Sequence, residues 1–265
     1  MRHKSLLNKL ADQYETVDFL QGDPAWFMHQ VVGKRNQETM AFIASCLSYG
    51  ARKAFLPRIQ HLLDCSHAEP YEWILKGKYR LDIPDDDRCY YRLYSNSMMI
   101  DLFQALQKMY QEYGDMENYI RRYAETSEQT ESKSAFTAIE ALCHYFYQHD
   151  VKGIIPKNTL SCCKRVCMFL RWMVRTDSPV DLGIWGELID KRSLIMPLDT
   201  HVIQQAMRLK LLTSKSATMA SAQKLTSKLR EVFPDDPLKA DFALFGYGIN
   251  PVSYTHLTLP TILRV

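Results

Sequence analysis

The chain has 265 residues and a net charge of +3, and 46% of its residues are hydrophobic and 24% charged, which are ordinary values for a globular protein with a real core. No apolar run reaches the roughly 18–20 residues that a spanning helix needs, and the N-terminus lacks an apolar signal core, so we expect a cytoplasmic protein with no membrane partner. The seven cysteines are scattered and odd in number, which favours reduced thiols. Their spacing fits neither a zinc nor an iron–sulfur site, so we expect no metal and no cofactor.

The charge is unevenly distributed along the chain. Residues 151–230 hold 14 Lys and Arg against 5 Asp and Glu, a local balance of +9 that leaves −6 for the remainder. A basic segment of this kind is typical of a surface that binds a phosphate backbone. The alternative is a solvated face against which carboxylates from elsewhere in the chain fold.

Helical periodicity runs through most of the chain. Short alternating runs with hairpin turn signals are absent, so we predict an all-α fold. Tyr and Phe side chains at helical spacing are interpreted as core residues rather than as base-stacking platforms. Before the basic segment, helices are predicted at residues 1–20, 25–32, 36–49, 51–63, 71–75, 97–113, 116–123 and 133–147.

The polar run at residues 125–134 is the predicted boundary between two lobes of a single helical domain, which spans residues 1–251 and whose N-terminal helices pack back. Residues 252–265 fit no periodicity begun earlier, and we interpret them as a non-native tail. We expect a monomer.

A basic helix is predicted at residues 162–175. At 100° per residue, Lys164, Arg171 and Arg175 fall on one stripe, while the opposite face is apolar and predicts a core contact. Like charges one and two turns apart repel each other, so the stripe indicates an anionic partner. The alternative is that carboxylates from the acidic part of the chain pair with it.

A carboxylate is predicted at a helix start further along the chain. Pro197 disfavours a helical conformation of the residue before it, and Asp199 and Thr200 are good N-cap types ahead of a helical apolar spacing. The helix N-terminus favours the ionised carboxylate. Lys164 is predicted in the first turn of the basic helix, where the surrounding positive charge favours the neutral, nucleophilic amine. Such an amine can attack a sugar carbon while the carboxylate stabilises positive charge on the ring.

Several stretches resemble a known superfamily. Residues 198–203 (Leu-Asp-Thr-His-Val-Ile), continuing to Arg208 and Leu209, resemble the Asp-Thr-His-Val…Arg-Leu stretch of the helix-hairpin-helix DNA glycosylases, typified by endonuclease III and the 8-oxoguanine glycosylases. Residues 40–53 are similar to the family's early helix, whose end enters the lesion pocket. Residues 163–175, 197–202 and 241–246 resemble an uncharacterised bacterial branch of the superfamily, and the matches span most of residues 20–250.

Two features depart from the family pattern. The segment before Lys164 lacks the Gly-x-Gly that lets backbone N–H groups approach a DNA phosphate. Lys164 and Asp199 are 35 positions apart, and residues 181–189, which we predict to form an inserted helix, account for the excess length.

The resemblance implies a two-lobed helical architecture with the site between the lobes, and a DNA base-excision function: a glycosylase with an AP-lyase step. It implies double-stranded DNA with a damaged or abasic site as the partner, Asp199 as the catalytic carboxylate and Lys164 as the Schiff-base nucleophile. Tyr49 and Trp172 are the candidate walls of the pocket, with core packing as the alternative for each. The residues expected to contact DNA are Arg52, Lys53, Arg165, Arg171, Arg175 and His201.

Two other functions are compatible with the sequence. One is a non-catalytic nucleic-acid-binding module on the same scaffold, in which Lys164 only contacts a phosphate. The other is a helical interaction protein whose basic stripe binds an acidic partner.

Overall fold

The computed structural model describes residues 3–126 and 134–249, and this part of the chain is mostly helical, which confirms the predicted all-α class. None of its helices is long and apolar enough to cross a membrane. The predicted tail at residues 252–265 lies outside the described residues. With η for a 3-10 helix, the elements are α1 (Lys4–Tyr14), η1 (Val17–Leu20), η2 (Pro24–His29), α2 (Lys34–Leu47), α3 (Arg52–Cys65), α4 (Pro70–Leu75), α5 (Tyr79–Asp82), β1 (Cys89–Tyr91), β2 (Tyr94–Ser95), α6 (Asn96–Tyr113), α7 (Met116–Thr126), α8 (Ala135–Gln148), α9 (Lys164–Val174), η3 (Lys191–Ser193), α10 (Thr200–Arg208), α11 (Met219–Arg230) and α12 (Lys239–Ile249).

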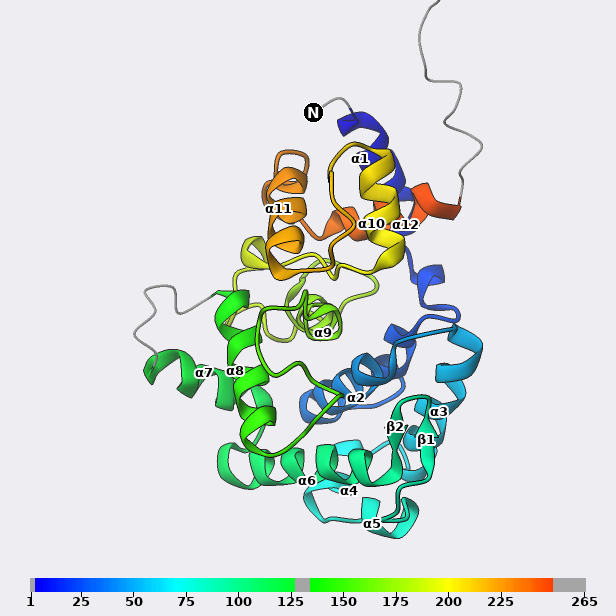
Figure 1. Cartoon of the computed structure of the whole chain (residues 1–265), viewed down its shortest axis with the longest axis vertical. Coiled ribbons are helices and arrows are strands. Elements are labelled where there is room, and N and C mark those ends of the chain that lie inside the picture. The colour runs from blue at the N-terminus through cyan, green and yellow to red at the C-terminus, as the bar shows by residue number, and fades with distance from the viewer. Residues whose placement is uncertain (1–2, 127–133, 250–265) are drawn as a thin grey trace, which may run out of the picture.

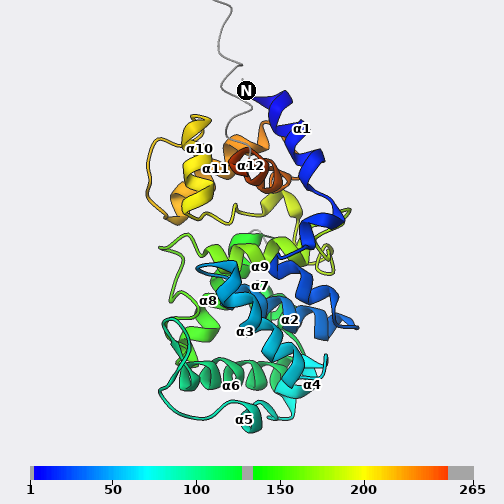
Figure 2. The ribbon, with the colours of Figure 1, turned by 90° about the vertical axis from the view of Figure 1, so that its right-hand side faces the viewer.

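The helices form two groups with α9 between them (Figures 1 and 2). One group contains α2 to α8, and the other contains α1 and α10 to α12. Helix α1 packs against α12, so the two ends of the described chain lie in the same group. The predicted lobe boundary at residues 125–134 falls mostly in residues 127–133, outside the described residues. Helices α7 and α8, on either side of this segment, pack against each other.

Helices α2 and α9 form the centre of the molecule. All α2 residues from 38 to 47 are buried, which confirms the predicted buried helix, and so are all α9 residues from 166 to 174. Phe42 of α2 lies edge to face with Phe169 of α9 and stacks on Phe146 of α8, with ring centroids 5.2 Å apart in both pairs. This aromatic contact holds α9 against the larger group of helices.

A short hairpin, β1–β2, is absent from the sequence prediction. Its strands have only three and two residues, too few to show an alternating pattern. Its turn uses Arg92 with φ 52°, and a non-glycine residue in this conformation carries none of the usual glycine turn signal. The hairpin packs on α6.

Residues 181–189, predicted as an inserted helix, form a series of turns instead. The N–H of Leu182 donates to the carbonyl of Trp172 at 2.8 Å, and the N–H of Trp185 donates to the carbonyl of Met173 at 2.7 Å. Both carbonyls lie in the last turn of α9, where a helix has no internal donors for them. The segment therefore supplies hydrogen-bond donors to the free carbonyls at the end of α9 and does not form a helix of its own.

The structure contradicts the prediction that Arg171 and Arg175 belong to a basic surface stripe that meets DNA phosphates. Only 4% of Arg171 and 1% of Arg175 is exposed. Carboxylates pair with both side chains, so this part of the stripe is internal, and for these two arginines the alternative offered by the sequence is the correct one. The cost of burying two guanidinium groups requires such pairing.

Four carboxylates compensate these two arginines. Arg171 Nε donates to Asp181 Oδ1 at 3.3 Å, and Arg175 Nη2 donates to Glu15 Oε1 and Asp236 Oδ2 at 2.7 Å each. Glu15 directly follows α1, and Asp236 lies just before α12. The cluster thus ties α9 to both terminal helices. Further ion pairs join Arg171 to Asp241 and Arg175 to Asp181.

We expect Arg175→Ala to lower the free energy of unfolding by about 3–5 kcal/mol, because it leaves several carboxylates buried without their cation. Urea unfolding measures this loss. Lys152→Ala is the control, since Lys152 belongs to an exposed pair with Asp150 at 3.6 Å and should change the stability little. Equal losses in the two variants would contradict a stabilising role for the cluster.

Candidate functional site

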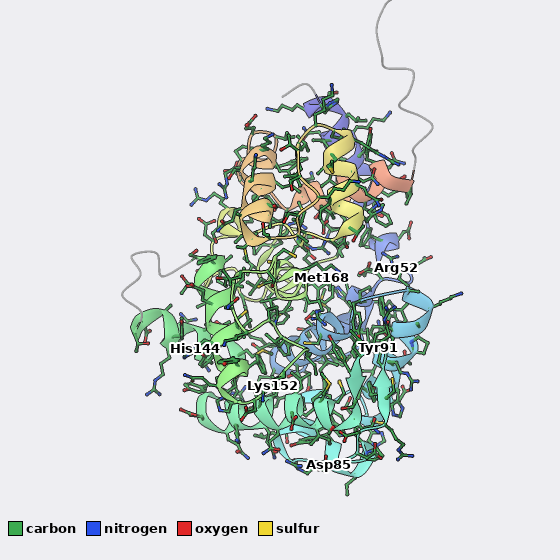
Figure 3. The ribbon with its side chains drawn as sticks, in the orientation of Figure 1. Arg52, Asp85, Tyr91, His144, Lys152 and Met168 are labelled. Atoms are coloured by element: carbon green, nitrogen blue, oxygen red, sulfur yellow. The ribbon has the colours of Figure 1, made fainter. Side chains whose placement is uncertain are left out.

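A cavity of about 710 Å³ lies between the two groups of helices, beside α9. Its wall is formed by η2, the residues between α2 and α3, the start of α3, the β1–β2 turn, α9, the start of α10 and α12. Figure 3 labels Arg52 and Met168, two of the lining residues, at the level where the two groups meet. A cavity of this size can bury most of the surface of a nucleoside-sized ligand.

Lys164 and Asp199, the two predicted catalytic residues, meet in this cavity. Lys164 Nζ is 3.9 Å from Asp199 Oδ2 and 3.5 Å from Met168 Sδ. The Lys164 side chain is 26% exposed and that of Asp199 43%, so both can reach a ligand. The structure therefore brings together an amine and a carboxylate that are 35 positions apart in sequence.

Local geometry fixes both side chains. Asp199 is the N-cap of α10, and its Oδ1 accepts a hydrogen bond from the N–H of Val202 at 2.9 Å, so that Oδ2 faces Lys164. Cys163, with φ 45°, directs the chain into α9 at Lys164. Cys162 Sγ donates to the carbonyl of Leu198 at 3.2 Å, which joins the two segments that carry the pair.

Two further carboxylates line the cavity, and the sequence prediction did not include them in the site. Asp241 of α12 pairs with Arg171, and burial raises the pKa of Asp241 above its ordinary value while Arg171 opposes the rise. Asp23 accepts from Arg52 Nη2 at 3.1 Å and from the N–H of Ala25 at 3.0 Å, and burial raises its pKa as well. Asp23 has an N-cap signal before Pro24, but neither residue carries a local sign in the sequence that it would line a cavity.

Tyr49 and Trp172, the predicted pocket walls, both line the cavity. Tyr49 is held by the hairpin, because its hydroxyl donates to the carbonyl of Tyr91 and accepts from the N–H of Leu93, both at 3.2 Å. Trp172 is completely buried. Core packing, the alternative for each residue, therefore coexists with a position on the cavity wall.

Arg165 packs against the same aromatic wall. Its guanidinium carbon lies 5.5 Å from the ring centre of Tyr49 and 5.8 Å from that of Tyr94, and its Nη1 donates to the carbonyl of Cys46 at 3.2 Å. Among the described residues, no carboxylate forms an ion pair with it. Arg165 thus adds positive charge to the cavity wall without an anionic partner there.

The other predicted DNA contacts lie near the mouth of the cavity. Arg52 is exposed at the start of α3 and is anchored by Asp23, and Lys53 next to it is exposed but does not line the cavity. His201 is exposed and lines the cavity, with its ring packed over Gly248 of α12. Among the described residues, no group of three or more His, Cys, Asp or Glu side chains is placed to hold a metal ion.

A family model described as "Protein of unknown function (DUF2400)" matches residues 23–250. The chain belongs to this family. No curated protein and no solved structure matches the chain. Every residue that lines the cavity, except Phe19, lies within the part that the DUF2400 model matches, so the cavity belongs to the family region of the chain.

The cap role of Asp199 makes a prediction about stability. Asp199→Ala should lower the free energy of unfolding by about 1 kcal/mol, whereas Asp199→Asn should leave it nearly unchanged, because asparagine is also a good N-cap. Thermal unfolding of the two variants measures the difference. Equal destabilisation by both substitutions would show that the side-chain cap does not hold the start of α10.

Proposed function

We propose that this DUF2400 protein is a DNA glycosylase with an AP-lyase step. The observation that carries the proposal is the approach of Lys164 Nζ to Asp199 Oδ2, at 3.9 Å, within a cavity of about 710 Å³. The resemblance of residues 198–203 to the helix-hairpin-helix glycosylases supports the same reaction.

The proposed reaction uses the pair as nucleophile and electrostatic stabiliser. Once it has given up a proton to solvent, the amine of Lys164 attacks C1′ of the damaged deoxynucleotide. The bond to the base breaks, and its electron pair leaves on the base with a proton from the attacking amine. Asp199 stabilises the positive charge that develops on the sugar. Opening of the sugar ring gives a Schiff base to Lys164, and β-elimination then releases the 3′ phosphate.

The cavity suits a nucleotide that has left the duplex. A base in a helical stack is inaccessible to a side chain, so an enzyme of this type must extrude its target. Aromatic side chains on the wall, including Tyr49, Tyr94 and Phe245, can stack on the extruded base. The cavity opens between the two groups of helices, where an extruded nucleotide would enter.

The phosphate contacts in this proposal differ from those that the sequence predicts. Arg171 and Arg175 are compensated inside the fold, which leaves Arg52, Lys53, Arg165 and His201. Arg52 and Lys53 are exposed beside the mouth of the cavity. They are the candidates for contacts with the strand that carries the damaged nucleotide.

Borohydride trapping tests the chemistry. We expect the wild-type protein to form a covalent adduct with an abasic-site duplex, and Lys164→Gln to form none, because the amide cannot make a Schiff base. Asp199→Asn, which keeps the cap, should slow base release by about 10²–10⁴-fold on a panel of lesion duplexes.

The position of the adduct provides the control. Peptide mapping of the trapped wild-type protein should place the crosslink on Lys164, and Lys53→Gln should trap normally. The absence of an adduct and of base release on every duplex of the panel would refute the enzymatic function.

A second candidate is a nucleic-acid-binding module without chemistry. Exposed lysines that form no ion pair among the described residues favour it, and they include Lys53 at the start of α3 and Lys210, Lys215 and Lys224 between α10 and the end of α11. Such a module would bind DNA while Lys164→Gln and Asp199→Asn changed nothing but affinity.

Salt titration measures the phosphate contacts under either function. If Lys53 contacts one phosphate, Lys53→Gln should reduce the slope of log K against log salt by about 0.9. Lys108→Gln, on α6, is the control and should leave the slope unchanged. Identical slopes for wild type and Lys53→Gln would remove Lys53 from the DNA contacts.

A further inference from the structure

Two guanidinium groups lie over the ring of Tyr49. The guanidinium carbon of Arg92, in the β1–β2 turn, is 5.4 Å from the ring centre, and that of Arg165, on α9, is 5.5 Å from it. The two positive charges repel each other, and the one aromatic ring attracts each of them only weakly. An anion bound beside this ring would remove the repulsion.

Neither arginine forms an ion pair with a carboxylate of the described residues. The other cations that line the cavity each have one, in the pairs Arg52–Asp23, Lys164–Asp199 and Arg171–Asp241. Burial lowers the pKa of Arg165 below its ordinary value, because its charge is partly removed from water. Arg92, by contrast, is exposed. The wall beside Tyr49 therefore keeps an excess of positive charge, and an anion in solvent can reach it at Arg92.

The fold holds Arg92 at this position. Its backbone has φ 52°, which is unfavourable for a residue other than glycine, and the N–H of the next residue, Leu93, donates to the Tyr49 hydroxyl at 3.2 Å. Gly50 leaves free the space that the guanidinium occupies, because a Cβ at Gly50 would lie 2.6 Å from Arg92 Nη1. The turn and the absence of a side chain at Gly50 thus place an exposed guanidinium in one defined location.

This location is the edge of the cavity, beside the start of α3. Gly50, next to the Arg92 guanidinium, and Leu93 both line the cavity. Helix α3, whose first two residues are the proposed contacts with the DNA strand, begins two residues after Gly50. Figure 3 labels Tyr91, the neighbour of Arg92 in the chain, and Arg52 on the same side of the molecule. A strand that passes α3 and places one nucleotide in the cavity would run past Arg92.

A DNA phosphate is the anion that suits this position. A guanidinium group presents its N–H donors in a fixed fork that matches two oxygens of a phosphate. An extruded nucleotide stays joined to its neighbours through the backbone, so phosphates must lie at the mouth of a cavity that holds the nucleotide. The charge that the fold leaves uncompensated is therefore where the strand would bring a negative charge.

We infer that Arg92 binds a backbone phosphate that flanks the extruded nucleotide, while Arg165 adds positive potential beside it. The inference rests on the proposed glycosylase function, and it makes the β1–β2 hairpin a part of the DNA-binding surface. Arg92 forms this contact only after extrusion, because an intact duplex keeps every nucleotide and its phosphates outside the cavity. Its role is to position the strand and not to act on the sugar.

Salt titration with two duplexes tests this contact. One duplex carries a tetrahydrofuran abasic analogue, which can enter the cavity but cannot form a Schiff base, and the other has the same sequence without a lesion. We expect Arg92→Gln to reduce the slope of log K against log salt by about 0.9 on the analogue duplex and to leave it unchanged on the intact duplex. A local structural effect of the substitution would lower affinity without changing the slope. Arg92→Lys, which keeps the charge, should retain the wild-type slope.

Arg88→Gln is the matched control. Arg88 directly precedes β1, its side chain is 75% exposed, and it pairs with Asp86 at 2.7 Å, so its charge is already compensated. This substitution should leave both slopes unchanged. Lys53→Gln should instead reduce the slope on both duplexes, because the exposed start of α3 can meet the strand before extrusion.

The outcomes separate this inference from the proposed function. If Arg92→Gln keeps the wild-type slope on the analogue duplex, or lowers it equally on both duplexes, the inference is wrong, and borohydride trapping at Lys164 still supports the glycosylase function. If the slope falls only on the analogue duplex but no duplex is trapped or excised, the phosphate contact holds and the catalytic function fails. If Arg92→Gln weakens binding of an oligoglutamate peptide and changes neither DNA slope, the hairpin binds an acidic protein and the inference is overturned.

Discussion

The compensation of charge around α9 is the constraint on which the rest of the structure depends. Arg171 and Arg175 bring two guanidinium groups into the interior, and each needs carboxylates because an unpaired buried charge is strongly unfavourable. Those carboxylates come from the residue after α1, from the segment after α9 and from the approach to α12. These ion pairs bring distant parts of the chain to α9. The group of helices formed by α1 and α10 to α12 packs around that helix.

The cavity is a consequence of this arrangement. Helix α9 is packed on α2 through Phe42 and Phe169 and is tied to the terminal group through its arginines, so its N-terminal part lies where the two groups face each other. Lys164 is there because it opens α9, and Asp199 is there because it opens α10. The carboxylate of Asp241 serves both features, since it neutralises Arg171 and also lines the cavity.

The sequence predicted features that depend on nearby residues and missed those that depend on the fold. The buried α2, the cap at Asp199 and the position of Lys164 follow from local patterns, and the structure shows all three. The burial of Arg171 and Arg175 could not be predicted, because the sequence of a cationic stripe is the same whether water or a carboxylate from a distant part of the chain faces it. Asp23 and Asp241 were missed for the same reason. Residues 181–189 were misassigned because their N–H groups donate hydrogen bonds to the last carbonyls of α9. The sequence of this segment does not show that these carbonyls will lie next to it.

The double use of Asp199 restricts how the site can work. One carboxylate oxygen is committed to the first turn of α10, so the side chain cannot rotate toward a ligand without releasing that helix end. In the proposed reaction the carboxylate therefore keeps its position, and the sugar must move toward it. Recognition in that reaction then depends on the free energy needed to extrude the nucleotide from the duplex. This free energy is lowest for a nucleotide whose pairing or stacking is already weakened. Under the proposed function, selection of damaged DNA can thus begin in the duplex, before any side chain contacts the base.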